Sequence, residues 1–297
     1  MTVTALPPGV RWRPALVARR RNGRVFVWLC YGATAFGIVA LLVLLTDVLV
    51  KGVPYLSWEF LTSFPSRLAD RSGVLAALVG TFYVGIIVVV VAFPIGIATA
   101  IWLEEYAPQG PLKRILETNI GNLAGVPSII YGMLGLAVFV RALSLQRSLI
   151  AGGLTIAVLV LPIVIINAQE ALRAVPSGIR HASYALGATR WETVRYHVLP
   201  AATPGILTGT ILALSRAVGE AAPIILISSI AFIAFLPDGP LDSFTILPIQ
   251  IFIWVSKPQE QFHLIAASAI IVLLVLLLTM NALAIVLRDR ARRGTRW

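Results

Sequence analysis

Two charges of opposite sign lie within one apolar stretch of the sequence and are its best candidates for chemistry. Arg216 and Glu220 are four residues apart inside Val198–Leu236, so on a helix they lie one turn apart on the same face. A charge at the centre of a membrane costs about 2.5–3.5 kcal/mol on insertion scales and persists mainly where it has a partner or a function. Two compatible interpretations follow. The pair can fix helix packing, or Arg216 can bind an oxyanion through its planar donors while Glu220 neutralises it when no anion is present.

A second group of polar side chains lies in the apolar stretch Thr118–Val140. Ser128 and Tyr131 follow Pro127, which leaves a backbone carbonyl without its usual donor. A transporter can use such groups at a broken helix to contact its substrate, but they can equally form hydrogen bonds between helices. We predict Ser128 and Tyr131 as substrate-pathway residues, together with the charged pair.

Motifs for other kinds of chemistry are missing from the sequence. It contains no Gly-x-x-x-x-Gly-Lys-Ser/Thr phosphate loop, so the chain should not hydrolyse ATP itself. The three histidines lack metal-ligand spacing, and no Ser, His and Asp fall at one expected membrane depth. Cys30 is the only cysteine, which excludes an internal disulfide and a cysteine-based metal cluster. We expect no catalytic residue, no metal and no cofactor.

The elements that must position these residues are membrane helices. Only 12% of the 297 residues are charged and 58% are hydrophobic, whereas soluble domains carry roughly 25% charged residues. Since a spanning helix needs about 20 mostly apolar residues, we predict an all-α membrane protein with six transmembrane helices. They lie in Val25–Val50, Val74–Leu103, Thr118–Val140, Ser148–Gln169, Val198–Leu236 and His263–Leu287. The fifth should begin near Pro204 and loosen near Pro223, and the shorter stretch Ser243–Ser256 should be re-entrant or interfacial.

The positions of the basic residues predict the orientation of the chain. There are 24 Lys and Arg against 13 Asp and Glu, a net charge of +11, which alone could indicate a nucleic-acid partner. However, 17 of the basic residues lie on the side of the two termini and 6 in the opposite loops. The positive-inside rule then places both termini in the cytoplasm, with a basic leader 1–24, a membrane domain 25–287 and a basic tail 288–297. We therefore expect a lipid bilayer, and no nucleic acid, around this chain.

The longest loop on the predicted cytoplasmic side, residues 170–203, has the pattern of two short helices joined at a glycine. Ser177 can cap the first helix, and Gly187 suits the left-handed residue that ends it. Thr189 and Glu192 have the spacing of a capping box for the second helix. No globular domain lies beside this loop in the sequence, so the pattern indicates either a docking surface or a helix lying on lipid.

The second helix of the loop should carry one apolar stripe. Trp191, Val194 and Val198 lie at positions i, i+3 and i+7, which fall on one side of an α-helix. Pro200 should then end this helix before the membrane begins.

This loop resembles the EAA loop of ABC importer permeases. The family pattern is Glu-Ala-Ala, three residues, Gly, nine residues, Ile, one residue and Leu-Pro. Here Ala182, Gly187, Leu199 and Pro200 match with the spacing intact, whereas His181 and His197 replace the Glu and the Ile. In the family the loop inserts a coupling helix into a cleft of a separate ATPase subunit. The resemblance therefore implies an ATPase-coupling surface at His181, Ala182, Ser183, Gly187, Ala188, Trp191, Leu199 and Pro200.

Three further segments are similar to phosphate-specific permeases, namely Gly125–Gly132, Arg216–Pro223 and Phe244–Ile251, and the last favours the A-type subunit. The resemblance runs from about Val74 to the C-terminus. It implies a type I ABC importer permease in the bacterial plasma membrane, and a substrate-pathway role for the charged pair. Inorganic phosphate would enter the cell with the help of a second permease, two ATPase subunits and an extracytoplasmic phosphate-binding protein. The alternatives are an importer of another oxyanion, such as sulfate or molybdate, and a non-transporting scaffold that docks a soluble partner.

Overall fold

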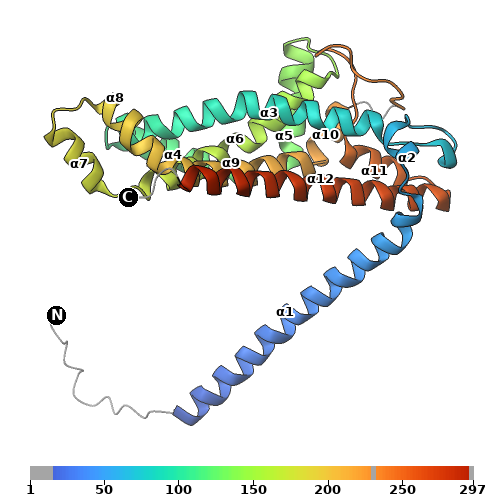
Figure 1. Ribbon diagram of the computed structural model, residues 1–297, viewed down its shortest axis with the longest axis horizontal. Helices are drawn as coiled ribbons and strands as arrows, with labels where there is room; N and C mark the ends of the chain where they lie inside the picture. Colours follow the sequence, from blue (N-terminus) through green and yellow to red (C-terminus); the bar gives the residue numbers. More distant parts are fainter. Residues whose placement is uncertain (1–15, 229–231, 294–297) are drawn as a thin grey trace. The chain divides into compact units, whose positions relative to one another are not determined.

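The computed structural model describes residues 16–228 and 232–293, which form helices and connecting loops without a strand (Figure 1). Parts of the predicted basic leader and tail, residues 1–15 and 294–297, lie outside the described residues. The chain divides into two compact units, Met1–Val50 and Lys51–Trp297. Each unit is described by itself.

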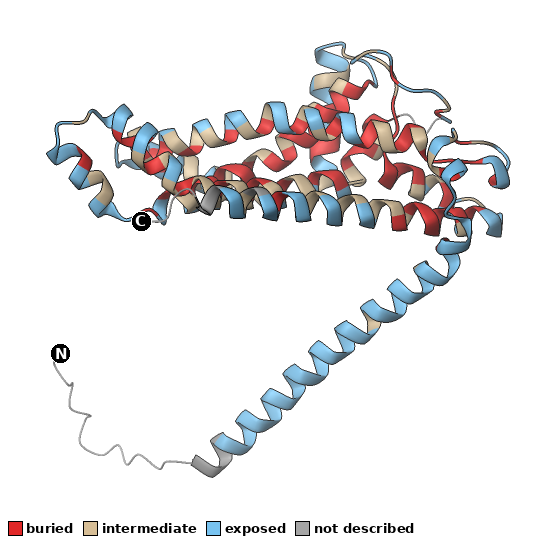
Figure 2. Cartoon of the chain, viewed as in Figure 1, coloured by how far each residue is buried: buried red, intermediate tan, exposed pale blue. Residues whose placement is uncertain are grey.

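The described part of the first unit is the long helix α1 (Leu16–Gly52). It begins inside the predicted basic leader and continues through the first predicted span without a break. Its apolar side chains are exposed along nearly the whole described helix (Figure 2). A helix that is apolar on all sides is suited to a membrane, and α1 is long enough to cross one.

The second unit is built on four long helices that pack along one another (Figure 1). Helix α6 contacts α3 on one side and α9 on the other, and α9 contacts α12. Within its most apolar window, 67% of the α6 residues are buried, which makes α6 the central helix of the bundle. The bounds are α3 (Leu75–Ile101), continued by the π-helix η3 (Trp102–Tyr106), α6 (Leu149–Arg173), α9 (Leu199–Gly219) and α12 (Glu260–Arg293).

Glycines allow α6 and α9 to approach each other closely. A Cβ atom on Gly209 would lie 2.4 Å from the Cβ of Asn167, and one on Gly205 would lie 2.8 Å from the Cβ of Ala171. Neither distance is possible without a shift of the helices, so the absence of a side chain sets the interhelical spacing here.

The third predicted span is sharply bent. Helix α4 (Pro111–Ala124) and helix α5 (Ser128–Gly135, continued by the π-helix η4, Leu136–Ala142) meet at 101°. The bend lies at Gly125–Pro127, because Pro127 cannot donate a backbone hydrogen bond and disfavours helical geometry in the residue before it. Five described helices are long and apolar enough to cross a membrane, and the predicted six are reached when this bent pair is one span.

The fifth predicted span differs from the prediction at its start. It does not begin near Pro204, which lies inside α9. Pro200 does not end the preceding helix, because it lies in the first turn of α9, where a missing N–H is tolerated. The predicted loosening near Pro223 is confirmed, because the helix breaks at Glu220 and Ala221 and Pro223 lies in the first turn of the next helix, α10 (Ala222–Ile227).

Short elements cover the two ends of the bundle (Figure 1). The stretch Ser243–Ser256 contains the short helix α11, which packs against α3 and α12 with Trp254 almost fully buried. That the stretch is re-entrant or interfacial stays a prediction. At the α11 end lie η1 (Val53–Tyr55), α2 (Trp58–Thr62), η2 (Ala69–Arg71) and α11 (Leu247–Val255), and at the other end lie α7 (Ser177–Ala185), α8 (Arg190–Thr193) and the π-helix η5 (Val194–Val198).

Candidate functional site

The predicted charged pair lies at a break between two helices. Arg216 is in the last turn of α9, and Glu220 follows the helix in an extended conformation. The Nε of Arg216 and the Oε1 of Glu220 are 3.5 Å apart, which confirms the ion pair. The Arg216 side chain is 51% exposed and that of Glu220 is 20% exposed. Half of the arginine surface is therefore free to meet another group, such as an oxyanion.

The third span is bent before α5, and the fifth span is broken before α10. The two helices that follow these breaks, α5 and α10, pack together. Helix α5 contacts α10, and a Cβ atom on Gly132 would lie 2.7 Å from the Cα of Pro223. Tyr131, Ala217 and Ile224 belong to the same buried cluster. The bundle therefore supports the break beside Glu220 with the bent half of the third span.

Ser128 and Tyr131 take different places in this arrangement. Ser128 is the first residue of α5 and is partly exposed. Tyr131 is only 6% exposed, and its hydroxyl donates a 2.8 Å hydrogen bond to the carbonyl of Leu123. The same carbonyl also accepts from the backbone N–H of Val126 at 3.1 Å, so Tyr131 supports the bend together with this backbone turn. Neither residue forms a hydrogen bond with the charged pair, and their role in a substrate pathway stays a prediction.

The ends of the predicted loop 170–203 belong to α6 and α9. The part between these helices, residues 174–198, which we call the EAA-like loop, has the predicted helix–glycine–helix geometry. Gly187 has a φ angle of +83°, and both hydrogen bonds of the Thr189–Glu192 capping box are present. Ser177 is not the cap of the first helix, however, because Pro176 occupies that position and Ser177 is the first helical residue. The turn is thus made by the glycine and by the second helix's capping box.

The apolar stripe predicted for the second helix is divided between two surfaces. Val194 and Val198 are fully buried, whereas Trp191 is exposed. The α-helical turn from Arg190 to Val194 is intact, so the spacing is as predicted and the burial is not. Val198 packs with Leu103 and Leu172 in a buried cluster of the bundle that Trp191 does not join. Of the three side chains in the predicted stripe, only that of Trp191 is therefore available to a partner.

The remaining predicted coupling residues are mostly accessible. Ser183 is the exception, because it is buried. Its hydroxyl lies 2.9 Å from the hydroxyl of Thr193, the last residue of α8, and this contact joins α7 to α8. Leu186, which directly precedes Gly187, is 89% exposed. Accessible in whole or in part are His181, Ala182, Gly187, Ala188, Trp191, Leu199 and Pro200, and an open groove of about 510 Å³ is lined by Ile179, Ala182, Ser183, Leu186 and His197.

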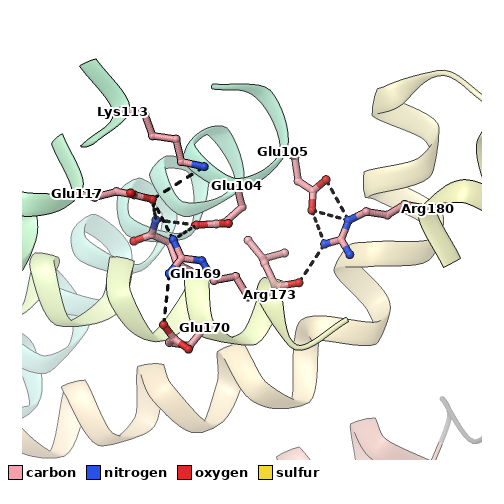
Figure 3. Close-up of polar contacts among 9 residues, drawn as sticks. Glu104, Glu105, Lys113, Glu117, Gln169, Glu170, Arg173 and Arg180 are labelled. Atoms are coloured by element: carbon pink, nitrogen blue, oxygen red, sulfur yellow. Dashed lines mark hydrogen bonds and ion pairs between the residues drawn. The ribbon is translucent and has the colours of Figure 1, made fainter. Parts of the chain in front are cut away.

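The structure adds a cluster of charged residues beside the EAA-like loop that the sequence did not single out (Figure 3). Arg173, at the end of α6, lies 2.6 Å from Glu104 in η3 and 2.9 Å from Glu117 in α4. Gln169 donates to Glu104, and Lys113 lies 3.9 Å from Glu117. This part of the cluster joins three transmembrane elements to one another.

The second part of the cluster joins the loop itself to the bundle. Arg180 in α7 lies 2.6 Å from Glu105, the residue after Glu104 (Figure 3). Adjacent carboxylates in η3 therefore meet arginines from two different helices. The only sequence signal was the Glu104-Glu105 pair at the end of an uncharged stretch. Among the described residues, no group of three or more His, Cys, Asp or Glu side chains could hold a metal ion.

Comparison with known proteins places this architecture in a family. Residues 92–293 match the family model described as "Binding-protein-dependent transport system inner membrane component", which covers more than half of the chain. The chain belongs to this family. All the candidate residues of this binding-protein-dependent transport component lie within the matched region.

Individual relatives agree with the family match. The chain is 36% identical to the probable ABC transporter permease protein YqgI of Bacillus subtilis, over 66% of this chain and 67% of the relative. It is 32% identical to the phosphate transport system permease protein PstA of Mycobacterium leprae, over 95% of this chain and 93% of the relative. The resemblance to A-type phosphate permeases predicted from the three segments is thereby confirmed.

Solved structures confirm the predicted fold. A chain from a bacterial ABC transporter involved in the import of the acidic polysaccharide alginate superposes with a TM-score of 0.64 and covers 94% of this chain and all of its own length. Its sequence identity is 16%, so this likeness concerns the fold alone. This transport-system component is an all-α membrane protein with the fold of ABC importer permeases.

Proposed function

We propose that this chain is the permease subunit of an ATP-driven importer that moves inorganic phosphate into the cell. The sequence relation to PstA over nearly the whole of both chains supports phosphate as the substrate. The structural observation that carries the proposal is Arg216, a half-exposed arginine at a helix break in the bundle. A charge in this place is expected to serve the transported ion.

Arg216 would bind phosphate through its planar guanidinium, which can donate to two phosphate oxygens at once. Its position in the last turn of α9 favours a positive charge, because the free carbonyls of a helix C-terminus are partly negative. Glu220 would replace the anion when the site is empty. A single 3.5 Å contact is weak enough for phosphate to displace, and the returning carboxylate would help phosphate to leave.

The same proposal assigns partners and an orientation to the chain. Both termini and the EAA-like loop would lie in the cytoplasm, a placement that the distribution of basic residues supports. Two ATPase subunits would power the importer, and this chain would contact one of them through exposed apolar side chains of the loop, including Leu186 and Trp191. A second permease would complete the pathway, and a phosphate-binding protein would deliver the substrate from outside.

The test is ATP-dependent uptake of labelled phosphate into vesicles that contain all four components. Arg216→Ala should reduce uptake by about tenfold or more, equivalent to at least 1.4 kcal/mol of lost interaction. Arg216→Lys should restore only part of it, because an ammonium cannot make the two-oxygen contact. Arg147→Ala, which removes an exposed arginine from the loop before α6, is the matched control and should retain uptake.

Three results would count against the proposal. Normal uptake without this subunit would exclude it from the pathway. Full uptake by Arg216→Ala in an intact complex would favour a scaffold or a purely structural pair. Stronger competition by sulfate or molybdate than by unlabelled phosphate would favour another oxyanion as the substrate.

A further inference from the structure

The guanidinium of Arg180 binds two separate parts of the bundle from its place in the EAA-like loop. Its Nη2 and Nε lie 2.6 Å and 3.1 Å from the Oε1 of Glu105 in η3. Its Nη1 donates to the carbonyl of Val175 at 2.8 Å, and Nη2 donates to that of Leu172 at 3.0 Å. The loop's first helix, α7, is therefore attached through one side chain to the extension of α3 and to the C-terminal end of α6 (Figure 3).

This contact is buried, unlike the neighbouring one. The side chains of Arg180 and Glu105 are 19% and 6% exposed, whereas Arg173 is 47% exposed. Solvent screens a buried pair much less than an exposed one. Removal of one partner would leave an uncompensated buried charge. The contact is also directional, because a planar fork fits a carboxylate in a defined orientation that lysine cannot reproduce. It should therefore transmit a displacement instead of yielding to it.

The EAA-like loop is built to move as one body. The hydrogen bond between Ser183 and Thr193 joins α7 to α8 inside the loop. A second side chain of the loop, Arg190, lies over the ring of Tyr106 at 5.6 Å, directly after Glu105 in η3. Two consecutive residues of η3 thus receive arginines from the two helices of the loop.

Beyond η3, the connection continues into the helix that carries the charged pair. The π-helix η3 is continuous with α3, and α3 contacts both α6 and α9. Single π-turns of this kind occur frequently at functional sites. A displacement of the loop therefore has a continuous path through Glu105 to α9, which carries Arg216 in its last turn.

We propose that Arg180 and Glu105 are the positioning residues through which movement of the EAA-like loop is converted into movement of α3. This inference rests on the proposed function, because it requires an ATPase subunit docked on the loop. Neither residue would touch phosphate or ATP. Their contribution would appear in the amount of phosphate moved for each ATP hydrolysed, since that ratio measures how well the loop and the pathway move together.

The experiment measures ATP hydrolysis and phosphate uptake side by side in vesicles with the complete transporter. Arg180→Gln and Glu105→Gln should keep the ATPase subunits bound and the hydrolysis running. Phosphate uptake per ATP should fall on the order of tenfold, within the range that couplings between sites usually span. The uptake per ATP of Arg180→Lys should be closer to that of Arg180→Gln than to that of the wild type, because lysine keeps the positive charge but lacks the planar guanidinium. Arg173→Gln is the matched control, since it breaks an arginine–glutamate contact that does not involve the loop, and its ratio should stay at the wild-type value.

A cross-link separates transmission from simple stability. In a Cys30→Ser background, which removes the only native cysteine, Glu105→Cys and Arg180→Cys are combined and joined by a short bifunctional maleimide. The uncross-linked protein should be uncoupled. The cross-linked protein should recover a substantial part of the uptake-to-ATP ratio, because a covalent joint replaces the ionic one. A merely structural contact predicts lost assembly with no such recovery.

The outcomes distinguish this inference from the function on which it rests. A wild-type complex that hydrolyses ATP without taking up phosphate would refute the proposed substrate. If the wild type takes up phosphate and Arg180→Gln and Glu105→Gln leave the phosphate moved per ATP unchanged, only the proposed role of the Arg180–Glu105 contact is refuted. Loss of ATPase binding in all of these variants would also overturn it, because the contact would then only hold the loop's shape.

Discussion

The turn of the EAA-like loop depends on Gly187, and replacing this residue with valine should uncouple ATP hydrolysis from uptake. Gly187 has a φ angle of +83°, and a Cβ atom added there would meet nothing within 4 Å. The substitution therefore costs backbone energy and creates no clash. Left-handed geometry costs an ordinary residue about 1–2 kcal/mol, which lowers the population of the native turn by a factor of about 5–30. A β-branched residue should lie at the upper end or beyond, because it tolerates positive φ least.

The assay is a series of substitutions at this one position, with uptake and ATP hydrolysis measured on the same vesicles. Gly187→Asn should remain close to the wild type, because asparagine enters the left-handed region most readily after glycine. Gly187→Ala should be intermediate, and Gly187→Val should show the largest loss of phosphate moved per ATP. Co-purification of the ATPase subunits establishes whether the altered loop still binds its partner.

Two results would refute this reasoning. If Gly187→Val couples normally, the left-handed turn is not required for docking or transmission. If Gly187→Asn is as impaired as Gly187→Val, the cause is the added side chain at a partner surface and not the backbone angle.

Two further predictions concern the bent third span. Gly132→Ala places a methyl group 2.7 Å from the Cα of Pro223, so α5 and α10 must separate. We expect a destabilisation of about 1–3 kcal/mol, measured as a lower thermal unfolding temperature in detergent. An unchanged temperature would show that these helices do not pack as described. Tyr131→Phe removes the hydroxyl that donates to the carbonyl of Leu123 and should cost about 0.5–1.5 kcal/mol of stability. The loss should be measured as faster amide hydrogen exchange around residues 123–127. Unchanged exchange would mean that other groups hold the bend.

The sequence alone determined the features that depend on composition or on neighbours in the chain. Long uncharged stretches identify the membrane helices, because a spanning helix needs about 20 mostly apolar residues. The Arg216–Glu220 pair and the Thr189–Glu192 capping box follow from four- and three-residue spacings, since residues this close in the sequence meet at the end of a helix as well as within it. Gly187 was identified because few residues other than glycine adopt its φ angle readily.

The tertiary structure decided where helices break and which distant residues meet. Proline signals predicted that the fifth span begins near Pro204, yet α9 begins at Leu199 and Pro204 lies inside it. Likewise, a helical stripe could not show that Trp191 is exposed while Val194 is buried, since burial depends on which side chains meet in the folded bundle.

The contact between Arg180 and Glu105 is the clearest case of what the sequence left undetermined. These residues are 75 positions apart. Nothing in the sequence distinguished either of them from the other charged residues of the predicted loops. Only the packing of α3 against α6 brings them together, and only burial turns two ordinary surface charges into a directional contact. Local spacing fixes interactions within one helical turn, whereas pairing across helices is set by the free energy of packing the whole bundle.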